Sequence, residues 1–499
     1  MNKIYKNLIT SILPQLVNIL TNFILPGLII AKFGSEVNGL VSTTKSIISY
    51  ISIVGAGIAT AVTQSFYGPV AKKDTERIKG MLNAANKMFV KYGIIYVVIT
   101  IVVALLYPFF IKTDINFITI ALLLVVMSLS GASEFFVTGR CSALLFANQK
   151  VYVCNLVKAG SLLVSLALAL IMLNIDVNIV FVELAISLVY VIRAAVLLFF
   201  VNRNFPELKG FKKSAPIKET VAKRKDAMIH YLSGLAISGS QTLILSFFVG
   251  LNAASVYAVY SIVFSGLQSI SASLSTAVTP YLGKEISLER EECARNLFNK
   301  IEIGCTLFVS FVFFVATFMI VPFIRLYTAG ADINYAYKDF AIIFAFSTVF
   351  YILKMPGTSA INAAGHFAET KSRAIIEASI CVSIGLVLTI LFGQNGCLIG
   401  TLVALGWRCF DTVLYANKYI LKTRSRNSIK RLIGCLAITG ISAVLSIFID
   451  ITPINYLQWI GYACITSVIA IVFIALYFAL FEIELTKKII TRLKKQKNN

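Results

Sequence analysis

Residues 34–63 read GSEVNGLVSTTKSIISYISIVGAGIATAVT, an apolar stretch that is long enough to cross a bilayer as one helix. Its polar side chains recur at steps of three and four residues, with the small Ala56 filling the one gap, which places them on one helix face: Ser42, Lys45, Ser49, Ser52, Thr60 and Thr63. Ile, Val and Tyr residues cover the opposite face. We therefore predict a membrane-spanning helix with a polar stripe, on which Lys45 contributes an ammonium group.

The same pattern returns 216 residues later (250 − 34). Residues 250–279 read GLNAASVYAVYSIVFSGLQSISASLSTAVT, and seven of the thirty aligned positions are identical. The polar stripe recurs, although Lys45 is replaced by Ser261. Chance similarity between two apolar, Ser/Thr-rich helices is the alternative, but other segments match at nearly the same offset. We infer an internal repeat, which in transporters places a substrate path between the two halves.

The composition predicts an all-α polytopic membrane protein. The 499 residues are 58% hydrophobic and only 14% charged, and the mean hydropathy is +0.84. The apolar stretches are continuous and have the length of transmembrane helices rather than of barrel strands. Fourteen spans are expected, at about 7–31, 39–66, 88–111, 115–147, 153–173, 178–201, 228–250, 254–282, 300–325, 338–364, 374–392, 395–421, 432–450 and 457–481.

The distribution of basic residues predicts the orientation of the chain. With both termini in the cytoplasm, about 35 of the 45 Lys and Arg residues fall in cytoplasmic segments, as the positive-inside rule requires. The net charge of +22 is therefore attributed to topology and to contact with anionic lipid headgroups, and no nucleic-acid partner is expected. We expect a multi-pass membrane protein with both termini in the cytoplasm.

The spans group into two six-helix bundles and a terminal pair. Residues 1–201 form the expected first bundle, 202–227 a basic cytoplasmic linker, and 228–421 the second bundle. Residues 422–499 hold helices 13 and 14 and a basic tail. The nine Cys include no CxxC pair and no Cys/His cluster, so neither a metal nor another cofactor is expected.

Amides and hydroxyls in the spans mark candidate lining positions of a polar cavity. Side chains of this kind are costly against lipid, so they are expected to face protein or water. Helices 1, 2, 7 and 8 carry them at helical spacing and are expected to line the path. The candidates are Gln15, Asn18, Asn22, Ser49, Ser52, Gln241 and Gln268.

Ionisable residues within the spans are the strongest functional candidates. The bases are Lys45, Arg140, Lys158, Arg193, Lys354 and Arg408, and the acids are Glu134, Glu183, Glu377 and Asp411. Each base costs about 2.5–3.5 kcal/mol at a helix centre, so it must reach the headgroups, pair, or face water. Six bases against four acids leave a positive surplus that suits an anionic substrate.

The expected environment of these bases depends on their depth. Lys158 is expected to snorkel to the cytoplasmic surface, and Arg193 and Arg140 could reach it as well. Lys354 and Arg408 lie near mid-span, where snorkelling is hardest. A same-face pair between Arg408 and Asp411, three residues apart, is an alternative that would remove Arg408 from the substrate site.

Fourteen spans, two parallel repeats and a terminal pair resemble the multidrug/oligosaccharidyl-lipid/polysaccharide (MOP) exporter superfamily. The start KNLITSILPQLVNILTNFILPGLIIAKFGSEVNGL, followed by SIISYISIVGAGIATAV and AKKD, is similar to Wzx-type flippases. This resemblance implies a V-shaped pair of bundles that carries an undecaprenyl-diphosphate-linked oligosaccharide outward by alternating access. It also implies pyrophosphate contacts for cavity cations, which we assign to Lys45, Lys354, Arg408 and Arg140.

The expected function is therefore that of a flippase in O-antigen, capsule or related polysaccharide synthesis, with membrane lipids and other assembly proteins as partners. The main alternative is a cation-coupled multidrug exporter similar to the MATE transporters. Such an exporter needs a carboxylate in a cavity, for which Glu134 and Asp411 are the candidates. No enzymatic activity is expected, because the chain offers no large outside loop or cytoplasmic catalytic domain.

Overall fold

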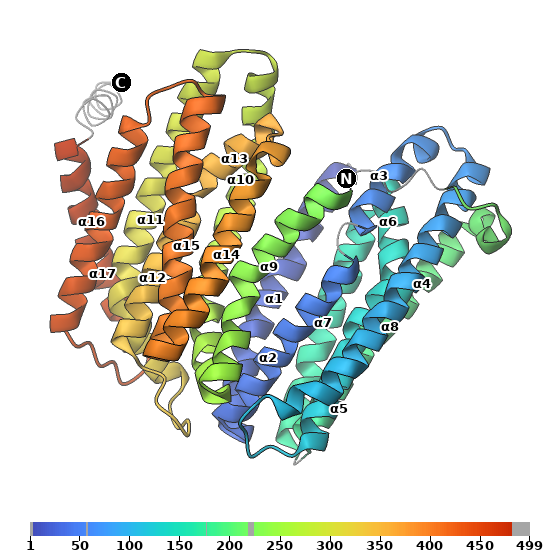
Figure 1. The fold of residues 1–499 in the computed structure, drawn as a ribbon, viewed down its shortest axis with the longest axis horizontal. Coiled ribbons are helices and arrows are strands. Elements are labelled where there is room, and N and C mark those ends of the chain that lie inside the picture. Colours follow the sequence, from blue (N-terminus) through green and yellow to red (C-terminus); the bar gives the residue numbers. More distant parts are fainter. Residues whose placement is uncertain (1–2, 56–57, 176, 218–223, 482–499) are drawn as a thin grey trace. The chain divides into compact units, whose positions relative to one another are not determined.

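The computed structural model describes residues 3–55, 58–175, 177–217 and 224–481, and these ranges contain helices and no β-strand (Figure 1). The first nine α-helices are α1 Lys3–Phe33, α2 Ser35–Ile51, α3 Ile58–Ala71, α4 Thr75–Leu106, α5 Phe117–Ser133, α6 Gly139–Ala147, α7 Val151–Asn174, α8 Ile179–Asn204 and α9 Arg224–Phe248. The others are α10 Leu251–Ser287, α11 Glu291–Tyr327, α12 Lys338–Leu353, α13 Met355–Ala364, α14 Phe367–Phe392, α15 Gln394–Tyr415, α16 Arg426–Phe448 and α17 Tyr456–Phe481.

Helices occupy all fourteen places where the sequence predicts a span. Among the described residues, twelve helical segments are long and apolar enough to cross a membrane. The other two places hold the broken helix α2–α3 and α9, whose apolar part Leu232–Phe248 is shorter. The chain is therefore a multi-pass, all-helical membrane protein, as expected.

The described helices form two compact units. Unit 1 comprises residues 1–258 and 331–333, and unit 2 comprises 259–330 and 334–499. In unit 1, α1 packs against α7 and α2, while α5 packs against α8. Helix α9, which the repeat assigns to the second bundle, contacts α2 in unit 1. The bundle boundaries drawn from the repeat stay a prediction.

The start of α2 packs tightly against the start of α10 within unit 1. A Cβ atom on Gly39 would overlap the backbone carbonyl of Leu251, so only glycine allows this approach. One residue earlier, the amide of Asn38 donates to the hydroxyl of Ser255 at 2.7 Å, and both side chains are buried. The predicted stretch 34–63 therefore contacts the start of its own repeat.

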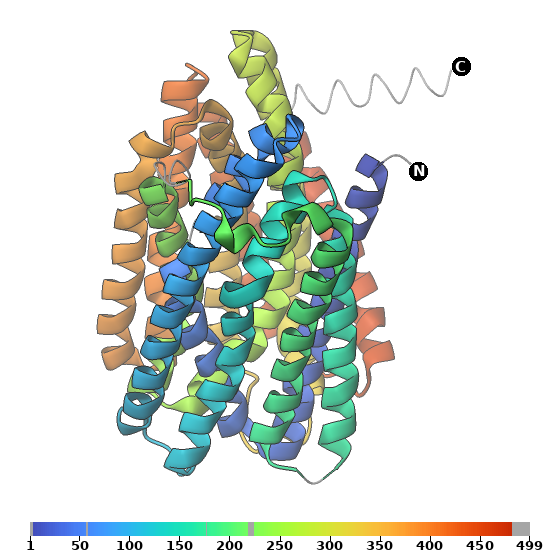
Figure 2. The ribbon, with the colours of Figure 1, turned by 90° about the vertical axis from the view of Figure 1, so that its right-hand side faces the viewer.

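The linker folds back on unit 1 as far as it is described. Its residues 206–217 include two short 3-10 turns, and Figure 2 shows this segment in green across the ends of the helices. The Asn83 amide of α4 donates to the carbonyl of Ser214 at 2.6 Å. The described part of the linker is therefore held against α4 through its backbone. Residues 218–223 lie outside the described residues.

Unit 2 is organised around α11 and around the hairpin of α14 and α15. Helices α16 and α17, the terminal pair that follows the repeat, both pack on α11. A buried ion pair between Arg431 of α16 and Glu302 of α11, at 2.8 Å, secures this contact. The last eighteen residues, 482–499, lie outside the described residues.

The outward-facing side chains agree with a lipid environment. On α4, Ile94, Val98, Ile101 and Leu105 are exposed at steps of three and four residues. A contiguous apolar face of this kind is rare on soluble monomers and is stable against lipid. Helix α17 is exposed in the same way over much of its length.

Replacing Gly39 should destabilise unit 1. We expect Gly39→Ala to lower the free energy of unfolding by about 1–3 kcal/mol, because its Cβ would force α2 away from Leu251. Melting of the purified protein in detergent measures the change. Gly68→Ala is the matched control, because no atom lies within 4 Å of a Cβ there. Equal melting temperatures for the two variants would contradict the close approach.

Candidate functional site

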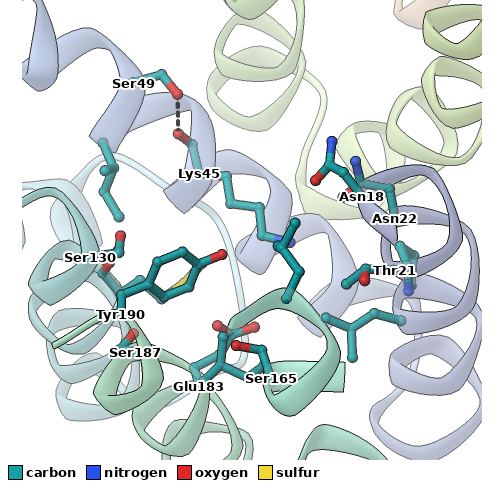
Figure 3. A pocket seen from close by; sticks show the side chains of 16 residues that line it. Asn18, Thr21, Asn22, Lys45, Ser49, Ser130, Ser165, Glu183, Ser187 and Tyr190 are labelled. Carbon is teal, nitrogen blue, oxygen red and sulfur yellow. Dashed lines mark hydrogen bonds between the residues drawn. The ribbon is translucent and has the colours of Figure 1, made fainter. Parts of the chain in front are cut away.

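A polar cavity of about 310 Å³ lies within unit 1 (Figure 3). Helices α1, α2, α5, α7 and α8 supply its walls. The polar lining consists of Asn18, Thr21, Asn22, Lys45, Ser49, Ser130, Ser165, Glu183, Ser187 and Tyr190. Polar side chains from five separate helices therefore converge at one point in an otherwise apolar bundle.

The cavity brings together four of the residues predicted from the sequence. Asn18 and Asn22 come from α1, and Lys45 and Ser49 come from α2. Spacings of four residues put each pair on one helix face, and the Ser49 hydroxyl donates to the backbone carbonyl of Lys45 at 2.9 Å. The two polar stripes therefore face the same space. Gln15 is exposed on α1 and is not among the lining residues.

Lys45 is the cationic group of the cavity. Its side chain is exposed to the cavity and extends toward Asn18 and Asn22 (Figure 3). No carboxylate among the described residues lies within 4.0 Å of its ammonium group, the limit for an ion pair. The positive charge of Lys45 is therefore available to a ligand.

The opposite wall carries residues that the sequence prediction did not assign to a site. Glu183, Ser187 and Tyr190 follow one face of α8, and Figure 3 shows Glu183 and Tyr190 directed into the cavity. Their spacing of four and three residues was a usable signal, since it marks one helix face. Ser52, by contrast, is in a 3-10 turn after α2 and donates to the carbonyl of Ile48 instead of lining the cavity.

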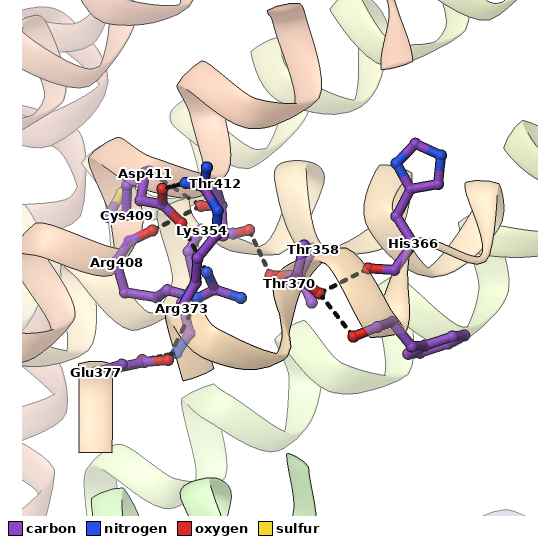
Figure 4. Close-up of polar contacts among 11 residues, drawn as sticks. Lys354, Thr358, His366, Thr370, Arg373, Glu377, Arg408, Cys409, Asp411 and Thr412 are labelled. Carbon is purple, nitrogen blue, oxygen red and sulfur yellow. Dashed lines mark hydrogen bonds and ion pairs between the residues drawn. The ribbon is translucent and has the colours of Figure 1, made fainter. Parts of the chain in front are cut away.

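A second cluster of charged side chains lies within unit 2 (Figure 4). The Lys354 ammonium is 2.7 Å from Glu377, whose other oxygen is 3.4 Å from Arg408. Arg408 also contacts Asp411 at 2.7 Å, and Arg373 forms an ion pair with the same carboxylate. Three bases and two acids leave a formal charge of +1 (3 − 2).

These ion pairs define the surroundings of Lys354 and Arg408. Both were predicted as cavity cations, and the structure shows their charges shared with Glu377 and Asp411, while a contact with substrate stays a prediction. The Arg408–Asp411 pair is the alternative that the three-residue spacing allowed. The role of Glu377 was missed, although it lies four residues after Arg373 on the same face of α14.

The remaining charged candidates of unit 1 lie away from the lining of the cavity. The Arg140 guanidinium donates to Asn86 and is 5.9 Å from the ring of Phe211, so it anchors the linker. Glu134, a candidate coupling carboxylate, pairs with Arg193 at 3.0 Å. Neither side chain lines the cavity that holds Lys45.

The two predicted glutamines of the second repeat have different environments. Gln241 is buried in α9 of unit 1, and its amide donates to the backbone carbonyl of Ile237 at 2.7 Å. Gln268 is half-buried on α10 in unit 2. The structure shows α1 and α2 lining the unit 1 cavity. A path lined jointly by the predicted helices 1, 2, 7 and 8 stays a prediction.

Comparisons with known proteins identify the type of fold. The MatE family model matches residues 231–395. The lipid II flippase MurJ, in an inward closed conformation, is similar over 95% of this chain and 98% of its own, with a TM-score of 0.69 and 12% identity. The chain therefore has a MATE-like fold.

Two further structures share this MATE-like fold. An inward-facing multidrug resistance MATE family transporter covers 82% of this chain and 95% of its own, with a TM-score of 0.66 and 12% identity. A MOP superfamily transporter from Pyrococcus furiosus, described with a binding pocket of reverse polarity, covers 85% and 96%, with a TM-score of 0.54 and 14% identity. No curated protein has a significant match to the sequence.

Removing the central carboxylate of the unit 2 cluster should destabilise this MATE-like fold. We expect Glu377→Gln to cost about 3–5 kcal/mol, because it leaves the charge of Lys354 without its buried partner and removes one of the two carboxylates beside Arg408. Melting in detergent measures the loss. The double variant Glu377→Gln with Lys354→Met should recover part of the lost stability, because it also removes the unpaired charge of Lys354.

The matched control is Glu134→Gln, since Glu134 is half-exposed and pairs with a single arginine. It should cost less than Glu377→Gln. A Glu377→Gln variant as stable as the wild type would show that the cluster does not hold α14 and α15 together.

Proposed function

We propose that this protein is a transporter that moves an undecaprenyl-diphosphate-linked oligosaccharide across the bacterial cytoplasmic membrane by alternating access. Both termini are then cytoplasmic, and the substrate moves from the inner to the outer leaflet. Membrane lipids surround the protein, and other polysaccharide assembly proteins supply or receive the substrate. The similarity to MurJ, a lipid II flippase, supports a lipid-linked substrate, and the MatE match supports a transporter.

The observation that carries this proposal is the positive charge of Lys45 in the unit 1 cavity, which has no carboxylate within ion-pair distance among the described residues. An ammonium group surrounded by protein at membrane depth attracts an anion more strongly than the same group in water. The neighbouring amides and hydroxyls of Asn18, Asn22 and Ser49 suit phosphate oxygens and sugar hydroxyls. This combination favours a phosphorylated, sugar-bearing headgroup.

The charged cluster of unit 2 adds to the same preference. Its bases exceed its acids by one, and the side chain of Arg373 is 31% exposed, more than any other member. A diphosphate can therefore bind to Arg373 without first breaking the buried pairs around Glu377. We assign Arg373 and Lys354 as secondary contacts of the anionic group, and Arg408 as their support.

A second function is favoured by one specific observation. Glu183 is a buried carboxylate in the unit 1 cavity, and a cation-coupled multidrug exporter requires such a group. The MatE match is compatible with this exporter. Lys45 opposes it, because its positive charge in the same cavity would repel a cationic drug.

Substitution of Lys45 tests the choice between the two functions. Purified protein in liposomes should flip fluorescent undecaprenyl-diphosphate-linked oligosaccharide, and Lys45→Ala should reduce the rate about 10- to 100-fold, because a charged hydrogen bond contributes about 1.5–3 kcal/mol. Lys45→Arg should retain most of the rate. Lys91→Ala is the control, because Lys91 is exposed on α4 outside the cavity.

The same liposomes should not export ethidium against a proton or sodium gradient. Ethidium export that survives in Lys45→Ala, together with no flipping of the lipid-linked oligosaccharide, would replace the flippase by the multidrug exporter.

The membrane potential should drive transport if the diphosphate crosses with uncompensated charge. A potential that is negative inside favours outward movement of each negative charge by about 2.3 kcal/mol per 100 mV. In liposomes with valinomycin, a potassium gradient sets the membrane potential, and equal potassium on both sides removes it. Flipping should therefore be slower with equal potassium. An unchanged rate would mean that the charge is compensated during transport.

A further inference from the structure

Glu183 differs from the other acidic residues at membrane depth. In the described part of the chain, Glu134, Glu302, Glu377 and Asp411 each form an ion pair with an arginine or lysine. Glu183 is only 3% exposed, and its Oε1 atom has no hydrogen-bond partner among the described residues. A buried carboxylate oxygen without a hydrogen-bond partner is destabilising, so a ligand that donates a hydrogen bond to it binds more favourably.

Glu183 lines the same cavity as the cationic group of Lys45. Lys45 is on α2 and Glu183 is on α8, and both line the space shown in Figure 3. They are more than 4.0 Å apart, beyond the limit for an ion pair, so neither neutralises the other by direct contact. The cavity therefore offers an anion-binding group on one wall and a hydrogen-bond acceptor on another.

The side chains near Glu183 extend this acceptor into a polar surface. The hydroxyls of Ser165, Ser187 and Tyr190 lie on the same side of the cavity (Figure 3). A carboxyl oxygen accepts hydrogen bonds in either protonation state. A ligand group with N–H or O–H donors, such as a sugar with hydroxyl or acetamido groups, would therefore satisfy Oε1 of Glu183.

The size of the cavity limits how much of the substrate it holds. About 310 Å³ is at the lower end of the 300–1,000 Å³ that is typical of small-molecule sites. This space suits a phosphate with one attached sugar rather than a whole oligosaccharide. The group nearest the phosphate is then the one that reaches Glu183.

We infer that Glu183 is a specificity-determining residue that accepts hydrogen bonds from the sugar next to the diphosphate, while Lys45 binds the phosphate. This inference rests on the proposed function and adds to it. The two residues divide recognition: Lys45 senses the charge that all such lipids share, and Glu183 senses whether a donor-bearing sugar is attached. A lipid with diphosphate and no sugar leaves the carboxylate unsatisfied.

The test compares two lipids on the full chain in nanodiscs. The probes are undecaprenyl diphosphate and undecaprenyl-diphosphate-N-acetylglucosamine, with undecaprenol as the uncharged reference. We expect the wild type to bind the sugar-bearing lipid about tenfold more tightly than the diphosphate, since one or two hydrogen bonds have that magnitude. Glu183→Gln should lose this ratio and keep its affinity for undecaprenyl diphosphate.

Two other variants separate the roles of charge and sugar. Lys45→Met should weaken the binding of both phosphorylated lipids and keep their ratio. Glu76→Gln, on the exposed first turn of α4, is the control and should match the wild type. Glu183→Asp keeps the carboxyl group but shortens the side chain, so it should reduce the ratio of the affinities for the two phosphorylated lipids. It provides a second test if Glu183→Gln does not fold.

Several results would overturn the inference. A wild type without preference for the sugar-bearing lipid, or a Glu183→Gln variant that keeps the ratio, would show that Glu183 does not recognise the sugar. Loss of affinity for both lipids in Glu183→Gln would assign it to the phosphate site instead. If undecaprenol binds as tightly as both phosphorylated lipids, the proposed function fails, and this inference fails with it.

Discussion

The low dielectric of the membrane interior governs where this chain can place its charges. A charge at that depth is tolerated when it has an opposite charge, a hydrogen-bonding neighbour or water beside it. The acids at Glu134, Glu377 and Asp411 meet this constraint through ion pairs of 2.7–3.0 Å. Lys45 and Glu183 meet it by facing a polar cavity, which is why that cavity is the best candidate for a binding site.

In both halves of the chain, charged side chains pair beside an interruption of a helix. The fourth predicted span is interrupted by a π-helical turn at Glu134–Thr138, and the tenth is interrupted between Leu353 and Met355. At the first interruption Glu134 pairs with Arg193, and at the second Lys354 pairs with Glu377, which also contacts Arg408. Arg193 and Arg408 are related by the repeat offset within one residue. Charged contacts thus occur beside the break of a helix in both halves.

The polar stripe on α1 and α2 could be predicted because its geometry is local. A spacing of three or four residues fixes the face of a helix, and an amide or ammonium in a bilayer avoids lipid, so Asn18, Asn22, Lys45 and Ser49 had to face something polar. The pairing of Lys354 could not be predicted in the same way. Its partner Glu377 is 23 residues away on another helix, and only packing determines which faces of two helices meet.

The sequence by itself determined a multi-pass helical protein, the places of its helices and the polar face of each one, because hydrophobicity and helical periodicity act within a single segment. Tertiary structure decided which charges remain available. It joined Glu183 of α8 to the stripe of Lys45, and it paired Lys354 and Arg408 with acids. The physical reason is that the state of a charge at membrane depth depends on the helix opposite, and a single segment carries no information about that neighbour.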